Sequence, residues 1–235
     1  MKKLIDGLLA KRNILRQNFA KLFHRGVPIV PIPFFGDIKT AKIVTIGANP
    51  SADELRENNW SESMSSTQIE EKLLNYFYDN QHKWFDTWEE ALNIIGFSYR
   101  DGTAAHIDLC PWATKSLSSL DPNEAVELFV KYAYAFVEVM NRHVHADFLL
   151  MAGTVTKKYY LDAFLGKFVN VEEFRLETNP VAKPGGSFAN QHTILLKNRS
   201  VKALFSSTSP SAFGDKKNTL PRLVKENKNF ILKNM

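Results

Sequence analysis

The distribution of hydrophobic and polar residues divides the chain into segments with helical and strand-like periods. Residues 3–24 place apolar side chains along one side of a helix and charged side chains along the other, which is the 3.6-residue period of an amphipathic helix. Packing of this helix on the rest of the domain explains the pattern more readily than a place on a membrane surface. The proline-rich stretch 27–37 should be extended, because proline disfavours helix in the residue before it.

Short apolar runs between polar segments predict several strands. Residues 43–46 (IVTI) are mostly β-branched and end at a glycine, as expected for a buried strand that leads into a loop. Residues 106–114 (HIDLCPWAT) predict a second strand, stopped by Pro111, and residues 147–153 (DFLLMAG) predict a third. Two further strands are predicted over residues 192–198 and 202–211.

Helical periods separate these strands. Residues 68–96 should be helical in two pieces, and Thr87, with a glutamate three residues later, predicts the N-cap of the second piece. Asp121 and Pro122 open a long helix, since proline is favoured at the first helical position. The tail from Asn218 onward predicts a polar, basic helix.

Strand–loop–helix units therefore repeat along the chain. This repetition predicts an α/β fold with three layers, in which helices flank a central parallel-rich sheet. We find no internal repeat or linker in the 235 residues, so we expect a single domain over residues 1–235 with the helix at 3–24 packed on it.

Composition limits the class of protein. Hydrophobic residues make up 44% of the chain and charged residues 23%, as in globular proteins. No apolar run approaches the ~20 residues that span a bilayer, and charges interrupt the apolar stretch that a secretory signal would need. The single cysteine, Cys110, excludes an internal disulfide and suits a reducing interior. We therefore expect a soluble, cytoplasmic monomer.

The net charge is +5, and a positive field favours association with polyanions, nucleic acid first among them. Many basic proteins bind nothing anionic, so charge alone is a weak indication. In open α/β sheets, ligands bind at the carboxyl ends of the strands. Four segments with polar, Gly or Pro residues leave predicted strands there: GANPSADE (47–54), DLCPWAT (108–114), AGTVTKK (152–158) and STSPSAFG (207–214). Each alone is explained as a turn, a cap or a strand end, whereas their convergence would form a site.

In their order and spacing these segments resemble the uracil-DNA glycosylase superfamily, especially its mismatch-specific and single-strand-selective monofunctional branches. GANPS (47–51) is similar to the Gly-x-Asn-Pro-Gly motif that activates water, and IDLCPW (107–112) to the Asn-x-Cys-Pro-Leu segment that reads the pyrimidine edge. FLLMAGTVTKK (148–158) is similar to the Leu-Leu-x-Gly-x-x-Ala-x-Lys step from strand to helix. LFSSTSPSAFG (204–214) takes the place of the His-Pro-Ser-Pro loop that enters the minor groove.

The resemblance implies a uracil-DNA glycosylase-like enzyme of base-excision DNA repair, which flips a damaged or deaminated base into a pocket and hydrolyses its N-glycosidic bond without metal or cofactor. Asn49 would hold the attacking water and Asp108 would face the base. The pocket would be formed by Gly47, Ala48, Pro50, Ser51 and Pro111. The DNA contacts would come from Ser207, Thr208, Ser209 and Ser211, from Lys216 and Lys217 as point charges, and from Phe213 as an apolar wedge, although a plain loop aromatic explains Phe213 equally well.

Two positions depart from the superfamily pattern. Asp108 stands where the superfamily normally has Asn, and an ionised carboxylate only accepts hydrogen bonds, so it would repel uracil O4. A protonated Asp108 would suit a cytosine-like edge, and we therefore expect that uracil is not the preferred base; capping of a nearby turn is the alternative role. Thr208 and Ser209 stand where many members have a His that stabilises the leaving base, and neither can supply a positive charge. His106 could compensate, although a structural histidine is the more ordinary interpretation.

Other candidates give weaker indications. Cys110 suits a packed thiol better than a nucleophile. His143 and His145 lack a third ligand at metal spacing, and 183–186 suits a flexible loop better than a phosphate-binding nest. Two other functions stay open: a nucleic-acid-binding member of the fold with weak or no catalysis, and a hydrolase of a free nucleoside or another small molecule.

Overall fold

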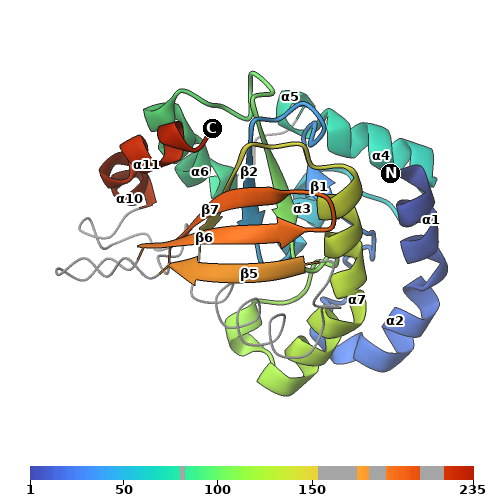
Figure 1. The fold of residues 1–235 in the computed structure, drawn as a ribbon. Coiled ribbons are helices and arrows are strands. Elements are labelled where there is room, and N and C mark those ends of the chain that lie inside the picture. Colours follow the sequence, from blue (N-terminus) through green and yellow to red (C-terminus); the bar gives the residue numbers. More distant parts are fainter. Residues whose placement is uncertain (80–82, 153–173, 180–188, 207–219) are drawn as a thin grey trace.

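The computed structural model describes residues 1–79, 83–152, 174–179, 189–206 and 220–235. These residues contain a sheet of seven strands in the order β1-β3-β2-β4-β7-β6-β5 (Figure 1). The strands are β1 (Phe34–Phe35), β2 (Ile43–Gly47), β3 (Ala104–Asp108), β4 (Phe148–Ala152), β5 (Phe174–Asn179), β6 (Ala189–Leu196) and β7 (Ser200–Ser206).

The centre of the sheet is parallel and its two margins are antiparallel. Strands β3, β2, β4 and β7 run in the same direction, whereas β1 pairs antiparallel with β3, and β6 and β5 extend β7 as antiparallel strands. The chain enters this centre at β2, adds β3 on one side, and then adds β4 and β7 on the other. The strand order therefore reverses between β2 and β4, which is where open α/β sheets form a crevice outside the strands' carboxyl ends.

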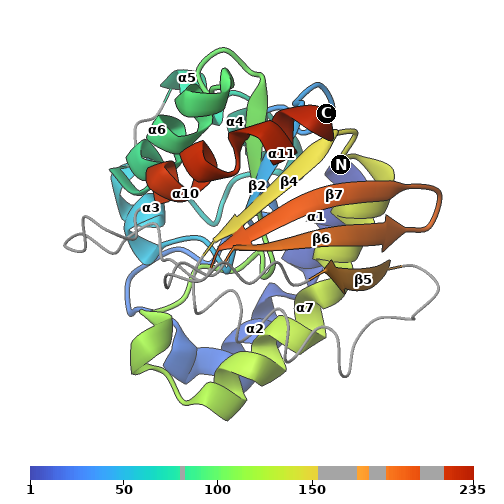
Figure 2. The ribbon, with the colours of Figure 1, turned by 60° about the vertical axis from the view of Figure 1, so that its left-hand side comes forward.

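Helices cover both faces of this sheet (Figures 1 and 2). One layer contains α1 (Lys2–Ala10), α2 (Arg12–Phe19) and α7 (Pro122–Arg142), and the other contains α6 (Asp86–Ile95), α10 (Leu220–Glu226) and α11 (Lys228–Lys233). The other helical elements are α3 (Ala52–Glu57), α4 (Ser66–Leu74), α5 (Tyr76–Asp79) and the 3-10 turns η1 (Ala20–Leu22), η2 (Lys83–Phe85) and η3 (Leu117–Ser119). The predicted mixed α/β architecture with a parallel-rich sheet is confirmed. Every residue of β2, β3 and β4 is buried, as expected for strands covered on both faces.

The longest described helix, α7, follows directly from its sequence. Asp121 caps it, with its Oδ1 accepting from the backbone N–H groups of Asn123 (2.8 Å) and Glu124 (3.1 Å), and Pro122 occupies the first position. Its inward positions at helical spacing are buried, including Leu128 and Phe136. The predicted start of this helix is therefore confirmed.

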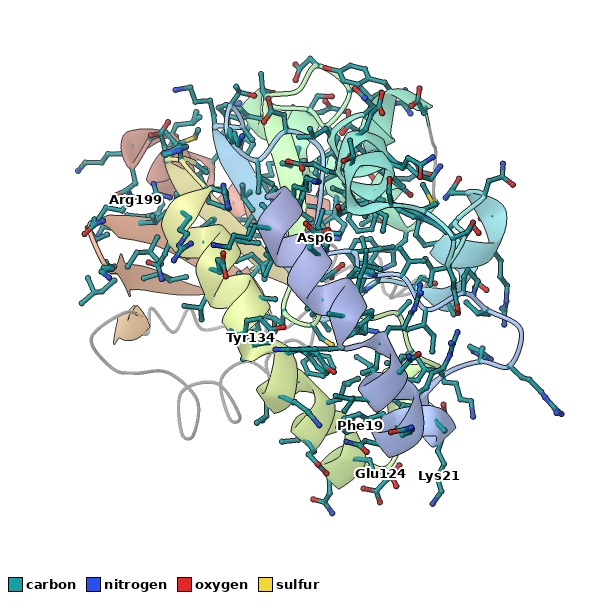
Figure 3. All side chains as sticks on the ribbon, turned by 90° about the vertical axis from the view of Figure 1, so that its right-hand side faces the viewer. Asp6, Phe19, Lys21, Glu124, Tyr134 and Arg199 are labelled. Carbon is teal, nitrogen blue, oxygen red and sulfur yellow. The ribbon has the colours of Figure 1, made fainter. Side chains whose placement is uncertain are left out.

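The amphipathic segment predicted at 3–24 forms α1, α2 and η1, with a break at Lys11. These helices lie against α7, where Lys11 Nζ donates to Tyr134 OH (3.1 Å) and Lys131 lies over the ring of Phe19 (Figure 3). At the lower end of the same view, Lys21 approaches Glu124 at 3.9 Å. The apolar side of the segment is buried, as the period predicts. Within the described residues, no helix is both long and apolar enough to cross a bilayer.

Several predicted boundaries were wrong. Thr87 is not the N-cap of its helix, because η2 runs directly into α6, which begins at Asp86. The second strand covers Ala104–Asp108 and ends before Pro111, since the backbone beyond Asp108 bonds to the loop after β2 and to residue 32. The C-terminal tail forms two helices with an apolar side, and it buries Leu220, Leu223, Val224 and Ile231.

Candidate active site

The parallel strands bring two of the predicted segments to one edge of the sheet. Gly47 at the end of β2 pairs with Asp108 at the end of β3, and Ala152 pairs with Ser206 at the ends of β4 and β7. Segments 47–54 and 108–114 therefore leave the same edge. Residues 153–158, the loop 207–214 with its serines, Thr208 and Phe213, and the lysines at 216 and 217 lie outside the described residues, so their roles stay predictions.

Gly47 is required by the closeness of the two strand ends. A Cβ at this position would lie 2.5 Å from Asp108 Oδ1 and 2.9 Å from His106 Nε2, closer than real Cβ atoms come to other groups. Glycine allows the backbone to approach these side chains directly. The carboxylate of Asp108 is thus held between the backbone of β2 and the imidazole of His106.

Asp108 is the end of a buried chain of polar side chains. His106 Nε2 lies 3.3 Å from Asp108 Oδ1, and His106 Nδ1 lies 2.6 Å from Thr45 Oγ1. Thr45 Oγ1 lies 2.5 Å from the hydroxyl of Tyr99, in the turn after α6. Exposure is 3% for Asp108, 2% for Tyr99 and 0% for the other two. Alternation along β2 and β3 explains the arrangement, because residues two apart share a face of the sheet.

Tyr99 stands at the end of this chain of hydrogen bonds that is opposite to Asp108. Burial raises the pKa of Tyr99 well above its ordinary value; the hydrogen bond with Thr45 acts against this, and Glu89 and Asp108 add to it. The hydroxyl therefore stays protonated and can donate to Thr45 Oγ1. Thr45 Oγ1 in turn has two acceptors for its single hydrogen, His106 Nδ1 and the carbonyl of Ala105 at 3.3 Å.

The choice of acceptor decides the role of His106 Nδ1. When Thr45 donates to it, Nδ1 is an acceptor and Nε2 is the ring nitrogen that can donate to Asp108 Oδ1. When Thr45 donates to the Ala105 carbonyl, His106 Nδ1 can instead donate to Thr45.

Aromatic rings surround this cluster. The ring centroids of Trp84 and Phe85 lie 5.1 Å from that of His106, and Trp88 lies at 6.0 Å. Phe77 stacks on Tyr99 with centroids 4.2 Å apart and an interplanar angle of 11°. An apolar wall lowers the local dielectric, which strengthens the hydrogen bonds inside it and raises the cost of breaking one.

Asn49 is positioned by the loop that follows β3. Its Nδ2 donates to Thr114 Oγ1 (3.0 Å) and to the carbonyls of Trp112 and Pro50 (both 3.2 Å). No described residue donates to its Oδ1. The amide is therefore fixed through its nitrogen.

The predicted pocket residues form one connected pair of loops. Leu109 N donates to the carbonyl of Gly47 (3.1 Å) and Cys110 N to that of Ala48 (3.0 Å). Pro50 and Pro111 are buried, and the Pro111 carbonyl accepts from Ile32 N at 2.7 Å. Ser51 is exposed and caps α3 by accepting from Asp53 N at 3.1 Å, so the structure gives this hydroxyl a structural contact.

Two further predictions concern single side chains. Cys110 is buried, and burial raises the pKa of its thiol, as expected for a packed thiol. Burial lowers the pKa of His143, with nearby positive charges adding to the effect. Across the described ranges, no group of three or more His, Cys, Asp or Glu residues is arranged to hold a metal ion.

Sequence reasoning missed Thr45 and Tyr99 as members of the cluster and interpreted His106 as an ordinary structural residue. The available signal was spacing: Thr45 and Gly47 on one strand, and His106 and Asp108 on the next, are polar or glycine positions two apart within buried runs. Tyr99 gave no local signal, because its partner Thr45 is 54 residues away. No family model matches the chain, and the curated proteins contain no significant sequence match to it.

Proposed function

We propose that this protein is a uracil-DNA glycosylase-like enzyme that hydrolyses the N-glycosidic bond of a damaged or deaminated base in DNA. The observation that carries the proposal is the pairing of Gly47 with Asp108, which brings Asn49 and a buried carboxylate to adjacent strand ends. The amide oxygen of Asn49 has no donor among the residues that the structure describes. The strand order with its reversal beside β2 is consistent with such a site. The basic net charge of +5 fits a DNA partner.

The proposed reaction uses one water molecule and needs no covalent intermediate with the protein. Asn49 Oδ1 accepts a hydrogen bond from the water and aims its oxygen at the sugar carbon. The C–O bond forms as the C–N bond breaks, the departing base takes the bonding electrons, and the water loses its proton to solvent. In the protonated form that we propose for Asp108, its carboxyl donates a hydrogen bond to the departing base, which offsets the negative charge that develops there.

This proton also gives the Asp108 position a role in base selection. In the protonated state, the carboxyl donates to a ring atom and accepts from an exocyclic amine, the edge that cytosine-like bases present. In the ionised state it would repel uracil O4. We therefore propose that uracil is not the preferred base. Robust release of uracil that is unchanged in Asp108→Asn would refute this part of the proposal.

The test offers the purified protein single strands and duplexes that carry uracil, hypoxanthine, xanthine or mismatched bases, and reveals abasic sites by alkaline cleavage. We expect product with at least one base, and a loss of about 10²–10³-fold in rate in Asn49→Ala. Asn93→Ala is the matched control, because Asn93 is an exposed residue of α6, away from the strand ends that carry Asn49 and Asp108.

The two other functions would give different results. Salt-sensitive DNA binding with no abasic product from any base would show a binding protein that retains the fold without the chemistry. Release of bases from free nucleosides alone would show a small-molecule hydrolase. Equal rates in Asn49→Ala, Asn93→Ala and the unaltered protein would remove Asn49 from the reaction.

A further inference from the structure

A cavity lies outside the candidate active site, at the junction of the N-terminal helices with the loop after α3. A cavity of about 480 Å³ opens between the end of α2, residues 24–29 and residues 60–62. Arg16, His24 and Arg25 line it, together with Ser61, Glu62 and the buried side of Trp60. We call this feature the N-terminal basic cavity.

Among the residues that line the N-terminal basic cavity, only Glu62 is acidic, and its carboxylate is already paired. Glu62 forms an ion pair with Arg16, and its Oε1 accepts from Ile29 N at 2.9 Å. Burial acts to raise the pKa of Glu62, but the hydrogen bonds from Arg16 and Ile29 N, with the charges of Arg16 and Arg12, outweigh this effect and lower it. Glu62 therefore fixes the wall of the cavity and leaves little negative potential within it.

Two other lining side chains, those of Arg25 and His24, are not engaged in this way. Arg25 is exposed, and among the described residues its guanidinium has no partner. His24 is half-buried, likewise with no side-chain partner in the described part of the chain. With Glu62 neutralised by Arg16, the remaining lining carries an unpaired positive charge and the hydroxyl of Ser61. This donor set suits a phosphate oxygen, since a guanidinium presents several N–H groups in one plane.

The segment that lines the cavity is continuous in sequence with residues that contact the loops of the candidate active site. Lys115 N donates to the Leu22 carbonyl (2.8 Å), and Ile32 N donates to the Pro111 carbonyl (2.7 Å), so residues 22–32 run beside residues 111–115. Within the latter segment, Thr114 holds the amide of Asn49. Leu22, two residues before His24, therefore contacts the same loop that positions Asn49.

From this continuity and charge, we propose that the N-terminal basic cavity holds a backbone phosphate of the nucleic-acid strand whose base is presented to Asn49 and Asp108. The inference rests on the proposed function, because it assigns to the same ligand a second contact outside the base pocket. Phosphate contacts fix the register of a protein on nucleic acid and do not read its sequence. The cavity would thus set the position of the strand.

The test measures binding of the full-length protein to a labelled single-stranded oligothymidine by fluorescence anisotropy over a series of salt concentrations. Such a strand has no damaged base, so binding is scored without turnover. In Arg25→Gln we expect affinity to fall several-fold at low salt, and the slope of log K against log salt to decrease by about 0.7, the value for one lost phosphate contact on single strands.

Arg100→Gln is the matched control, because Arg100 is also exposed and lies just before β3, at the opposite edge of the sheet. Equal losses in Arg25→Gln and Arg100→Gln would overturn the proposal, as would no change in Arg25→Gln. Thermal unfolding of both variants shows whether the fold is intact.

A free phosphate compound is the other source of the same chemistry. Titration calorimetry with inorganic phosphate and with thymidine monophosphate tests it. Arg25-dependent binding of either compound, with unchanged oligothymidine affinity in Arg25→Gln, would overturn the nucleic-acid assignment. Failure of base excision would leave Arg25-dependent strand binding intact, so failure of this proposal and failure of the enzymatic one are distinguishable.

Discussion

Gly47→Ala is a sensitive test of the geometry of the candidate active site, because the backbone of Gly47 lies directly against the side chain of Asp108. The added Cβ would lie 2.5 Å from Asp108 Oδ1, so the carboxylate oxygen must retreat by about 0.9 Å to reach 3.4 Å, where ordinary contact begins. That displacement disrupts the 3.3 Å contact with His106 Nε2. Overpacking costs about 1–3 kcal/mol and a lost buried hydrogen bond about 1 kcal/mol more, so we expect a destabilisation of roughly 2–4 kcal/mol.

Urea denaturation of the two proteins measures this difference directly. Gly7→Ala is the matched control, since Gly7 lies in α1 with nothing within 4 Å of an added Cβ. This control should gain about 0.5–1 kcal/mol, because alanine is favoured over glycine inside a helix. A displaced carboxylate should also slow base excision by Gly47→Ala by about 10²-fold. A Gly47→Ala protein that is as stable and as active as the unaltered one would refute the described packing of Asp108.

Three further predictions concern buried or paired side chains. Thr45→Val keeps the shape of the side chain but leaves Tyr99 and His106 without their shared hydrogen-bond partner. Urea denaturation should therefore show a free energy of unfolding lower by about 2–4 kcal/mol. A smaller decrease than that of Tyr99→Phe would contradict the central place of Thr45 in this chain of hydrogen bonds. Glu54 is 2% exposed, and its carboxylate accepts hydrogen bonds from Trp60 Nε1 (3.0 Å), Asn58 Nδ2 (2.9 Å) and the hydroxyl of Tyr76. Glu54→Leu should therefore lower the free energy of unfolding by about 3 kcal/mol or more. Glu57 is exposed, so Glu57→Leu should change stability little. The pKa of Glu62 is lower in the folded state than in the unfolded chain, where it is about 4.3. The ionised carboxylate therefore stabilises the fold above about pH 4.3, and this contribution is lost as the pH falls through the folded pKa. The stability difference between the unaltered protein and Glu62→Gln should therefore shrink below about pH 4.3, and a difference that grows there would contradict the pairing.

Much of the fold was predictable because its signals are local. The cap at Asp121, the proline after it and the helical spacing of buried residues define α7 without reference to the rest of the chain. The run ending at Gly47 defines β2 in the same way. The short strand β1 and the edge strand β5 were not predicted, because their pairing depends on partners far along the chain, and a two-residue strand such as Phe34–Phe35 has too few positions to show a period.

The candidate site was predictable to a similar extent. Parallel strands end at one edge, so the segments after β2 and β3 could be expected together, and the register of Gly47 with Asp108 confirms that they meet. The link from Asp108 through His106 to Thr45 and Tyr99 could not be predicted, since it depends on which faces of two strands and one turn oppose each other. The same holds for the N-terminal basic cavity, which joins residues 16–29 to residues 60–62.

We propose that DNA binds at the carboxyl edge of the parallel strands, beside Asn49 and Asp108. The most direct measurement is an NMR titration of the isotope-labelled protein with a single-stranded oligonucleotide, followed through backbone amide shifts. We predict the largest shifts in residues 47–51 and 108–114, with little change in residues 98–102 at the opposite edge. Shifts concentrated at 98–102 or elsewhere, with those of 47–51 and 108–114 unchanged, would contradict the account.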